Sequence, residues 1–443
     1  MIRALYSAAT WLAQPLLRRK LRRRAVAEPG YGEHVEERFG RYAMARPAGD
    51  APLVWIHAVS LGETRAAAIL LAALRQRLPG MRLLLTNGTA TGRAEGRKLL
   101  QAGDVQVWQP WDTCGAVRRF LMHFQPDVGV LMETEVWPNL MHEAARHGVP
   151  MALANGRLSD ASLRGAQRVG WLLRPAYRAL AAVWAQTEAD AARFRAVGAR
   201  GVRVLGNLKF DAQPDAALQA RAARWRTALA DRATLMLASS REGEERDFLA
   251  AIKASASATP ARTATDTEAD GVAKPLWLIV PRHPQRFDDV ARLAADAGFR
   301  VARRSAWADG PPPDALDADV WIGDSLGEMT LYYSLADAAL LGGSFAPLGG
   351  QNLIEAAACG CPVVMGPHTF NFAQAAELAE SAGAALRVAD MAGALDAAHA
   401  LLRDAGRHAA VRQAALRFAH AHHGAAERMA TAVVDELLAE RRG

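Results

Sequence analysis

The chain is 443 residues long and 51% of it is apolar, which is enough for two hydrophobic cores of ordinary size. Its formal net charge of +7 comes from the first 24 residues, which hold seven Lys or Arg side chains and no acidic one. The rest carries 46 basic and 46 acidic residues, which excludes the basic folded surface of a nucleic-acid-binding protein and favours attraction of the N-terminus to anionic lipid.

The first 17 residues combine apolar side chains with one polar stripe. At spacings of four, three and four, four polar residues share one face of a helix: Arg3, Ser7, Thr10 and Gln14. A helix of this length reaches about 25 Å, against roughly 30 Å for a hydrocarbon core. Residues 1–24 are therefore predicted to form a membrane-anchoring amphipathic helix with a basic cluster, with Tyr6 and Trp11 at headgroup level. The alternative is an amphipathic helix docked on its own domain.

Downstream, short apolar runs alternate with helix-compatible stretches in two successive series. Runs that are apolar throughout, joined by such crossovers, are typical of parallel sheets covered on both faces. The pattern predicts an α/β protein with two Rossmann-like, doubly wound domains that face one another across a cleft. The N-terminal domain is expected to span residues 25–213, the second domain 214–420, and a C-terminal helix 421–443. Residues 254–274 are small, polar and without periodicity, which predicts a flexible insertion.

The most informative stretch of the second domain is residues 336–367, which reads as a strand, a glycine-rich loop, a helix and a strand. The loop contains Gly342 and Gly343, and the helix opens near Asn352. Glycines let a backbone approach an anion, and a helix N-terminus points unpaired N–H groups at it, so the pattern favours a phosphate. Glu355 is placed to accept hydrogen bonds from a ribose. A tight turn also explains the glycines, and helix capping is the alternative for the glutamate.

Two further strand ends of the second domain carry candidate ligand contacts. Pro281 and Arg282 leave a strand, and a fixed guanidinium there suits a leaving phosphate, with a helix-capping loop as the alternative. Gly327 and Glu328 end another strand, where their backbone is in place to contact a base or a phosphate.

The first domain has carboxylates at the ends of its predicted strands. Glu63 lies in the first turn of a helix that follows a strand, where a carboxylate can remove a proton from an attacking hydroxyl. Glu133 and Glu135 come just after another strand and are in place to steer a sugar. Lys209 lies at the domain junction, where its charge would stabilise negative charge on a donor. The alternatives are favourable helix-dipole electrostatics for Glu63, local capping for one of the other glutamates, and a solvated hinge charge for Lys209.

In order and spacing, eight segments resemble the 3-deoxy-D-manno-octulosonic acid (Kdo) transferases of lipid A biosynthesis. The segments are HAVSLGE, METEVWPN, GNLKFD, VPRHPQRF, GDSLGEM, GGSF, NLIEAAACG and VMGPHTFNF. This family is similar to two-domain glycosyltransferases of the GT-B type. The resemblance implies an inverting transferase that moves Kdo from CMP-Kdo to a lipid A precursor, lipid IVA, at the cytoplasmic face of the cell inner membrane.

The resemblance also implies roles for particular residues. It makes Glu63 the general base on the acceptor hydroxyl, and Glu133 and Lys209 candidates for transition-state stabilisation. The implied partners are CMP-Kdo, the lipid A precursor and an anionic membrane surface, with no nucleic acid. The candidate CMP-binding residues are Pro281, Arg282, Gly327, Glu328, Gly342, Gly343, Asn352, Leu353, Ile354 and Glu355.

No D-x-D metal motif follows a predicted strand, and the three cysteines lack metal-ligand spacing. We therefore expect a reaction without cofactor or metal, in which Arg282, Lys209 and helix dipoles take the part of a divalent ion. Two other functions share features of this pattern. A nucleotide-sugar epimerase would use the same paired fold and phosphate loop, but it has no use for a membrane anchor. A non-catalytic membrane scaffold would have no need of Glu63, Arg282 and Glu355.

Overall fold

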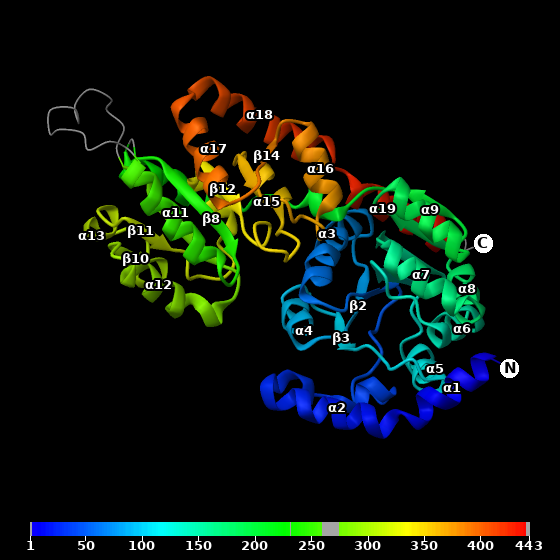
Figure 1. Ribbon diagram of the computed structural model, residues 1–443. Coiled ribbons are helices and arrows are strands. Elements are labelled where there is room, and N and C mark those ends of the chain that lie inside the picture. Colours follow the sequence, from blue (N-terminus) through cyan, green and yellow to red (C-terminus); the bar gives the residue numbers. More distant parts are fainter. Residues whose placement is uncertain (1, 231, 259–273, 440–443) are drawn as a thin grey trace, which may run out of the picture. The chain divides into compact units, whose positions relative to one another are not determined.

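The computed structural model describes residues 2–230, 232–258 and 274–439. The described chain divides into two compact α/β units (Figure 1). The first unit runs to Asp211 and resumes at His423, and the second spans Ala212–His422. The C-terminal residues therefore complete the first unit and do not extend the second.

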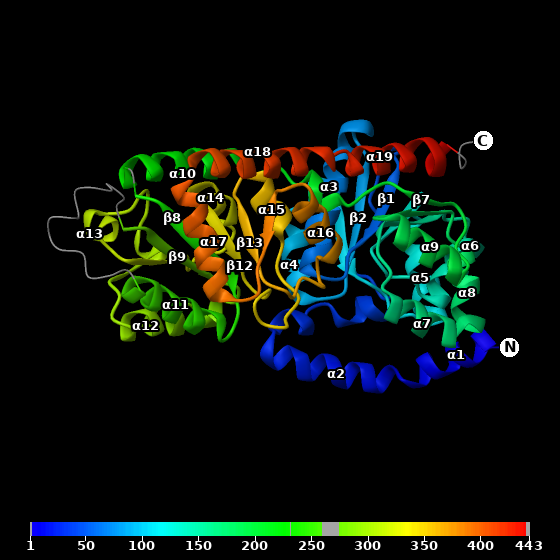
Figure 2. The ribbon, with the colours of Figure 1, turned by 45° about the horizontal axis from the view of Figure 1, so that its top comes forward.

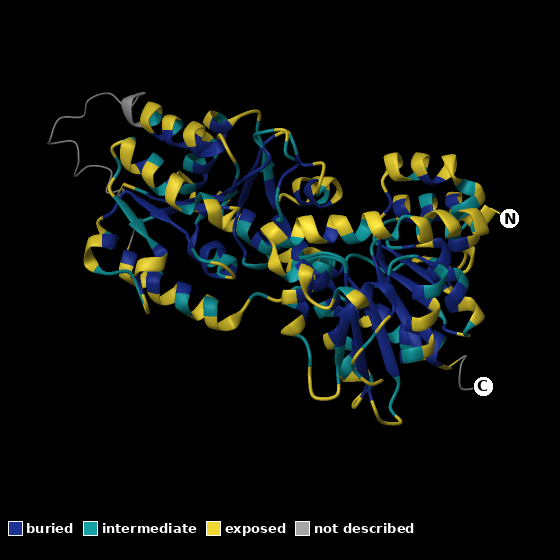
Figure 3. Ribbon diagram, turned by 90° about the horizontal axis from the view of Figure 1, so that it is seen from below, coloured by how far each residue is buried: buried dark blue, intermediate teal, exposed yellow. Residues whose placement is uncertain are grey.

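The first unit is built on a parallel sheet. The strands are β1 Leu53–His57, β2 Arg82–Asn87, β3 Val105–Trp108, β4 Val128–Met132, β5 Met151–Gly156, β6 Ala182–Ala185 and β7 Val202–Val204. Within the described residues they form one seven-stranded sheet in the order β3-β2-β1-β4-β5-β6-β7. Most of their side chains are buried, which explains why the corresponding runs of the sequence are apolar throughout (Figure 3).

Helices cover both faces of this sheet. They are α3 Leu61–Arg77, α4 Ala90–Arg97, α5 Cys114–Phe124, α6 Pro138–Arg146, α7 Asp160–Arg168, α8 Gly170–Arg178, α9 Glu188–Val197 and α19 Ala425–Ala432. One hydrophobic core holds residues of α5, α6, α8 and α9, and a second core holds residues of α3 and α19. The N-terminus of α19 is capped by Asp211, whose carboxylate accepts hydrogen bonds from the N–H groups of Gly424 and Ala426.

Two helices precede the first sheet, α1 Ile2–Leu12 and α2 Gln14–Ala27 (Figure 2). The single helix predicted over residues 1–24 is thus divided at Ala13, and its second part ends three residues later than expected. Among the described residues, no helix has both the length and the apolar composition that crossing a bilayer requires.

The polar stripe of α1 is the side that docks on the first unit. Ser7 Oγ and an Nη of Arg3 donate to Oδ1 of Asn139, at 2.8 and 3.3 Å. The Tyr6 hydroxyl donates to the Asp112 carboxylate at 2.8 Å. The large apolar side chains on the other sides of α1 and the start of α2 are exposed: Ile2, Leu5, Trp11, Leu12 and Leu16. The orientation is opposite to that of an ordinary surface helix, which buries its apolar side.

The second unit repeats the architecture. Its strands are β8 Thr234–Ser240, β9 Leu276–Pro281, β10 Val301–Arg303, β11 Val320–Ile322, β12 Ala338–Leu341, β13 Val363–Met365 and β14 Ala385–Arg387. Over the described residues they pair in parallel in the order β10-β11-β9-β8-β12-β13-β14. The helices are α10 Ala216–Leu229, α11 Glu244–Ala258, α12 Phe287–Asp296, α13 Pro313–Leu316, α14 Met329–Leu335, α15 Leu353–Ala358, α16 Ala373–Ser381, α17 Met391–Arg403 and α18 Ala405–Ala421.

The predicted insertion begins later than the sequence suggested. Residues 254–258 are the last turn of α11, so the prediction of a flexible segment from residue 254 was wrong there. Their Ala-rich composition is compatible with helix, because alanine has the highest helix propensity. Residues 259–273 lie outside the described residues.

In both sheets the strand order reverses beside the first strand of the unit. β1 lies between β2 and β4, and β8 lies between β9 and β12. Ligands of doubly wound sheets bind at the carboxyl ends of the strands where this reversal occurs. We call the loops after β1 and β4 (residues 58–63 and 133–137) the first switch point. The loops after β8, β9 and β12 (residues 241–243, 282–283 and 342–346) are the second switch point.

Candidate active site

Glu63 is held at the first switch point by the start of α3. Ser60 is the N-cap, and its Oγ accepts a hydrogen bond from the Glu63 N–H at 3.3 Å. The Glu63 carboxylate reaches back, accepting from the Val59 N–H at 2.9 Å and from the Ser60 hydroxyl at 3.0 Å. This is the reciprocal geometry of a capping box, so the S-x-x-E spacing places the carboxylate as well as starting the helix.

The environment of Glu63 makes its carboxylate a base near neutral pH. Burial raises the pKa of Glu63 to about 7, the Val59 N–H opposes this rise, and the negative charges of Glu133 and Glu135 add to it. The structure therefore brings three glutamates from the two loops of the first switch point within electrostatic reach of one another. A carboxylate with this pKa accepts a proton more readily than an exposed one, which suits general-base catalysis.

The two other glutamates follow β4 in a constrained loop. Glu133 has a φ of +58°, a left-handed conformation that non-glycine residues rarely adopt and that is often found at functional sites. Its N–H donates to the Ala154 carbonyl at 3.0 Å, so the turn is fixed to β5. The Glu135 carboxylate accepts from the Trp137 indole at 2.8 Å, and burial raises the pKa of Glu135. Trp137 itself is 43% exposed beside these carboxylates.

Lys209 lies at the same carboxyl edge of the first sheet. It belongs to a short 3-10 helix, η3 Leu208–Asp211, that packs against α3. The N–H of Leu208 donates to the Asn155 side chain at the end of β5, at 3.0 Å, and this anchors the segment. The predicted catalytic residues Glu63, Glu133 and Lys209 thus come from loops that leave one edge of one sheet; their roles stay predictions.

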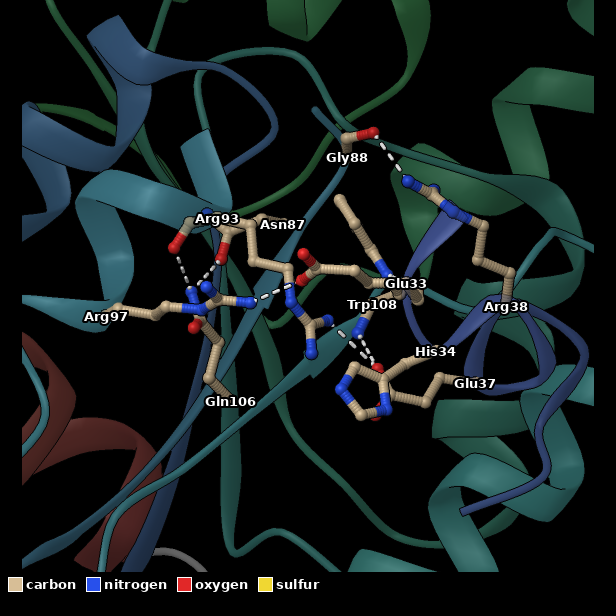
Figure 4. Close-up of polar contacts among 10 residues, drawn as sticks. All are labelled: Glu33, His34, Glu37, Arg38, Asn87, Gly88, Arg93, Arg97, Gln106 and Trp108. Carbon is tan, nitrogen blue, oxygen red and sulfur yellow. Dashed lines mark hydrogen bonds and ion pairs between the residues drawn. The ribbon is translucent and has the colours of Figure 1, made fainter. Parts of the chain in front are cut away.

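A buried polar network supports the loop that carries Glu63 (Figure 4). η2, Val35–Phe39, contributes Glu37, whose carboxylate pairs with Arg93 of α4 at 2.9 Å. The next residue, Arg38, stacks on the Trp108 ring and donates to the Gly88 carbonyl at 3.0 Å. The N–H groups of Gly88 and Thr89 in turn donate to the Val59 carbonyl. Val59 is therefore fixed at its carbonyl by the β2–α4 loop, while its own N–H binds Glu63.

At the second switch point three strand ends lie side by side. Ser240 pairs with Pro281 across β8 and β9, and the Arg282 N–H donates to the Ser240 carbonyl at 3.0 Å. On the other side of β8, the Gly342 N–H donates to the Ala238 carbonyl at 2.8 Å. A Cβ on Gly342 would lie 2.5 Å from the Ser239 carbonyl oxygen, so close strand packing alone requires this glycine.

The glycine-rich loop already surrounds an anion, the Glu244 carboxylate. Its Oε2 accepts from the Gly343 N–H at 2.8 Å, and its Oε1 accepts from the N–H groups of Phe345 and Ala346, both at 3.3 Å. Glu244 is 2% exposed and lies at the start of α11. The amides that the sequence pattern offered to a phosphate are thus hydrogen-bonded within the chain, and the contact of Gly342 and Gly343 with a donor stays a prediction.

Arg282 is the exposed cation of this edge, next to Pro281 at the buried end of β9. Its Nε donates to the Gln351 side-chain oxygen at 3.2 Å. Burial lowers the pKa of the neighbouring His283, and the charges of Arg241, Arg282 and Arg286 lower it further. The second switch point is therefore a concentration of positive charge.

The other predicted nucleotide contacts flank this edge. Asn352 caps the six-residue helix α15, with its side chain accepting from the Ile354 N–H at 3.2 Å; Leu353 is buried, and Glu355 is partly buried in the first turn. The Glu328 carboxylate forms ion pairs with Arg221 and Arg304, at 2.9 and 2.8 Å. Its preceding residue, Gly327, has a left-handed φ of +84° and open space around it. The contact of Gly327 and Glu328 with a nucleotide stays a prediction.

Comparison with known proteins identifies the family. Residues 33–212 match the family model described as 3-Deoxy-D-manno-octulosonic-acid transferase (kdotransferase). A 3-deoxy-D-manno-octulosonic acid transferase of Bordetella pertussis is 48% identical over 447 aligned positions, covering 99% of this chain and 100% of the relative. The chain belongs to the Kdo transferase family. It is an enzyme, and its activity is that of a glycosyltransferase.

Other comparisons agree on the family and the fold. A Kdo transferase of Haemophilus influenzae is 31% identical, with 90% of each chain covered. A structure of Anabaena HepE in complex with UDP has a TM-score of 0.57 at 13% identity, covering 87% of this chain and 99% of that one. The UDP-GlcNAc 2-epimerase of Neisseria meningitidis has a TM-score of 0.54 at 14% identity, covering 88% and 100%. These two likenesses concern the fold: the units of the Kdo transferase resemble the domains of GT-B glycosyltransferases.

One charged residue at the second switch point of this Kdo transferase was not singled out from the sequence. Arg241 comes directly after β8 at the second switch point, next to Arg282 on the adjacent strand. The sequence did contain a signal for this arginine, since the segment SSREG follows the first apolar run of the second series and precedes a helix-compatible stretch. Its importance depends on the strand order, which places β8 between β9 and β12.

Proposed function

We propose that this Kdo transferase moves Kdo from CMP-Kdo to a lipid A precursor with inversion, and that Glu63 is its general base. The observation that carries the proposal is the state of Glu63 at the first switch point. Its carboxylate is fixed by two hydrogen bonds, and its pKa is about 7. Such a group is substantially ionised at neutral pH and basic enough to take a proton from a reacting hydroxyl.

In the proposed step an acceptor hydroxyl oxygen attacks the anomeric carbon of Kdo while its proton passes to the Glu63 carboxylate. The bond from the anomeric carbon to the phosphate oxygen breaks, and CMP leaves with the electron pair. Attack from the face opposite the phosphate inverts the anomeric centre. Because the phosphate gains negative charge as this bond breaks, the guanidinium of Arg282 stabilises the transition state, with Glu133 and Lys209 as further fixed charges.

The proposed reaction needs no divalent ion, because fixed side-chain cations supply the charge that a metal would supply. Arg282 is exposed directly after β9, and Lys209 lies in η3 at the edge of the first sheet. Activity should therefore be the same in EDTA as in magnesium. Loss of activity in EDTA that magnesium restores would contradict this part of the proposal.

The acceptor is a lipid, and α1 and α2 provide a surface for the membrane. Leu5 is 70% exposed and Leu12 is 68% exposed, while the polar side of α1 is bonded to the first unit. The exposed side of α2 carries the cations Arg19, Lys20, Arg22, Arg23 and Arg24. An apolar side continuous with a basic one is suited to lie in the interface of an anionic leaflet, here the cytoplasmic face of the inner membrane.

Flotation with vesicles tests this surface. We expect binding to vesicles that contain phosphatidylglycerol, weaker binding to phosphatidylcholine alone, and a loss of about tenfold or more in the double variant L5E/L12E, because two buried apolar side chains contribute several kcal/mol. The variant L416E is the control, since Leu416 is 40% exposed on α18 of the second unit. Equal flotation of all three proteins would contradict the proposal.

The transfer itself is tested by CMP release from CMP-Kdo, with and without a tetra-acylated lipid A precursor. We expect release that depends on the acceptor, a product whose mass increases by whole Kdo residues, and an anomeric configuration opposite to that of the donor by NMR. Release that is independent of any acceptor would indicate a hydrolase. Retention of configuration would exclude direct attack with Glu63 as base.

A further inference from the structure

Arg241 and Arg282 are neighbours on adjacent strands at the second switch point. Ser240 is paired with Pro281 in the β8–β9 register, and each arginine is the next residue of its chain. The Arg282 N–H bonds to the Ser240 carbonyl, so this register continues to the arginines. Neighbouring strands lie about 4.8 Å apart, which places two guanidinium-bearing residues side by side at the edge where ligands of such sheets bind.

Arg241 has no anionic partner among the residues that the structure describes. Its guanidinium forms no ion pair or side-chain hydrogen bond with any residue that the structure describes, although the residue is partly buried. The adjacent Glu242 is exposed and forms no ion pair with Arg241, and the next two acidic residues along the chain are otherwise engaged. Glu244 binds backbone N–H groups, and Glu245 pairs with Arg286 at 3.0 Å and accepts from Ser240. A partly buried cation without a partner is unfavourable, so its presence here indicates an anion supplied from outside.

The residue beside Arg241 is Gly343, which has no side chain. Gly343 has a left-handed φ of +70°. A Cβ built on Gly343 would lie 3.6 Å from Cγ of Arg241 and 3.2 Å from the Gln351 amide nitrogen. Gln351 is the residue that binds Arg282. Arg241 and Gln351 therefore lie beside Gly343, with Arg282 bonded to Gln351. Because Glu244 occupies the loop amides, side chains must hold any anion here.

We propose that Arg241 binds the carboxylate of the Kdo residue in the donor, while Arg282 binds the phosphate. This rests on the proposed function, in which the donor is CMP-Kdo. In that donor the carboxylate is attached to the anomeric carbon that bears the phosphate oxygen, so its two anionic groups are only a few bonds apart. Two adjacent guanidinium groups match this pair, and each forms the planar, two-point contact that suits carboxylate and phosphate alike. Arg241 thereby selects donors whose sugar is an acid.

The experiment compares the KM for CMP-Kdo with the inhibition constant of CMP, which has the phosphate but no sugar carboxylate. We expect R241Q to raise the KM by about 10- to 100-fold, the range for one charge-assisted hydrogen-bonded contact, and to leave CMP inhibition within about twofold. R282Q should weaken both. R246Q is the matched control, because Arg246 is exposed on α11, outside the second switch point.

Each other outcome overturns the proposal in a distinct way. Equal weakening of CMP-Kdo and CMP by R241Q would assign Arg241 to the phosphate, and no effect on either would remove it from the donor site. If circular dichroism shows that R241Q fails to fold, R241K replaces it. A KM for CMP-Kdo and an inhibition constant of CMP that are both unchanged in R241K would overturn the two-point contact. A wild-type enzyme that neither releases CMP nor is inhibited by it would overturn the proposed function itself.

Discussion

The two switch points share one topology and carry opposite charges. The first has Glu63, Glu133 and Glu135 after β1 and β4, and these carboxylates raise the pKa of Glu63. The second has Arg241 and Arg282 after β8 and β9, and together with Arg286 they lower the pKa of His283. The same fold therefore gathers carboxylates at one place and guanidinium groups at the other. Strand order decides where a ligand binds, and the loop side chains decide which ligand it is.

The two switch points also differ in what supports their loops. At the first, a buried ion pair between Glu37 and Arg93 lies beneath the loops, and the Glu63 carboxylate itself binds the Val59 N–H. At the second, the carboxylate of Glu244 is enclosed by the loop amides, which donate hydrogen bonds to it. A carboxylate at a helix start is thus the proposed, partly accessible base in one unit and a buried structural acceptor in the other.

The largest expected effect concerns the base. E63Q should lower kcat by about 10²- to 10⁴-fold, because the amide retains the capping position but cannot take a proton. CMP inhibition should be unchanged, since Glu63 belongs to the other unit. E188Q, at an exposed glutamate in the first turn of α9, is the control. A kcat for E63Q within about tenfold of wild type would mean that Glu63 is a helix cap alone and that the first switch point has another base.

The next effect concerns stability beneath the first switch point. E37A should lower the free energy of unfolding by about 3–5 kcal/mol, because it leaves the Arg93 guanidinium buried and unpaired. Urea titration followed by tryptophan fluorescence measures it. E33A removes only the exposed pair with Arg97 and should leave the urea midpoint nearly unchanged. Equal midpoints for the two variants would show that the buried network does not support this loop.

At the second switch point, E244A should lower the free energy of unfolding by less than E37A does at the first. It leaves the Gly343, Phe345 and Ala346 N–H groups without their acceptor, which we expect to lower the free energy of unfolding by about 2–3 kcal/mol. The KM for the donor should rise with it, because Arg241 and Gln351 adjoin this loop. The exposed neighbour variant E242A is the control. Stronger CMP binding by E244A would instead show that the freed amides take the phosphate.

The smallest expected effect is a shift in pH dependence. In the wild type kcat/KM should fall as the pH drops below about 7, because the pKa of Glu63 is raised to that value and the protonated acid cannot act as a base. E135Q removes one negative neighbour, so Glu63 should ionise at lower pH and the acidic limb should move down by a fraction of a unit. An acidic limb that moves to higher pH in E135Q, or that lies near pH 4 in the wild type, would contradict the assignment of this limb to Glu63.

Much of the fold could be predicted because its signals are local. Runs that are apolar throughout indicated two parallel sheets, since both faces of each sheet are covered. The S-x-x-E spacing that ends at Glu63 involves only four residues, and these four residues fix the position of the Glu63 carboxylate. The family followed from short motifs in sequence order. Local signals were misleading at residues 254–258. Their small, polar composition suggested a flexible segment, but these residues continue α11.

Other features were decided by tertiary structure. Whether the polar stripe of α1 faces outward or inward depends on Asn139 and Asp112, more than 100 positions away in the chain. The glycine-rich loop was predicted to hold a phosphate, yet its amides bind Glu244, a residue about a hundred positions earlier. Arg241 matters only because strand order puts it beside Arg282. By itself, the sequence determined most of the elements and the family, and it singled out Glu63 as the candidate base. Burial, pairing and the neighbours of each charge depend on contacts between distant segments, and these exist only once the sheets have formed.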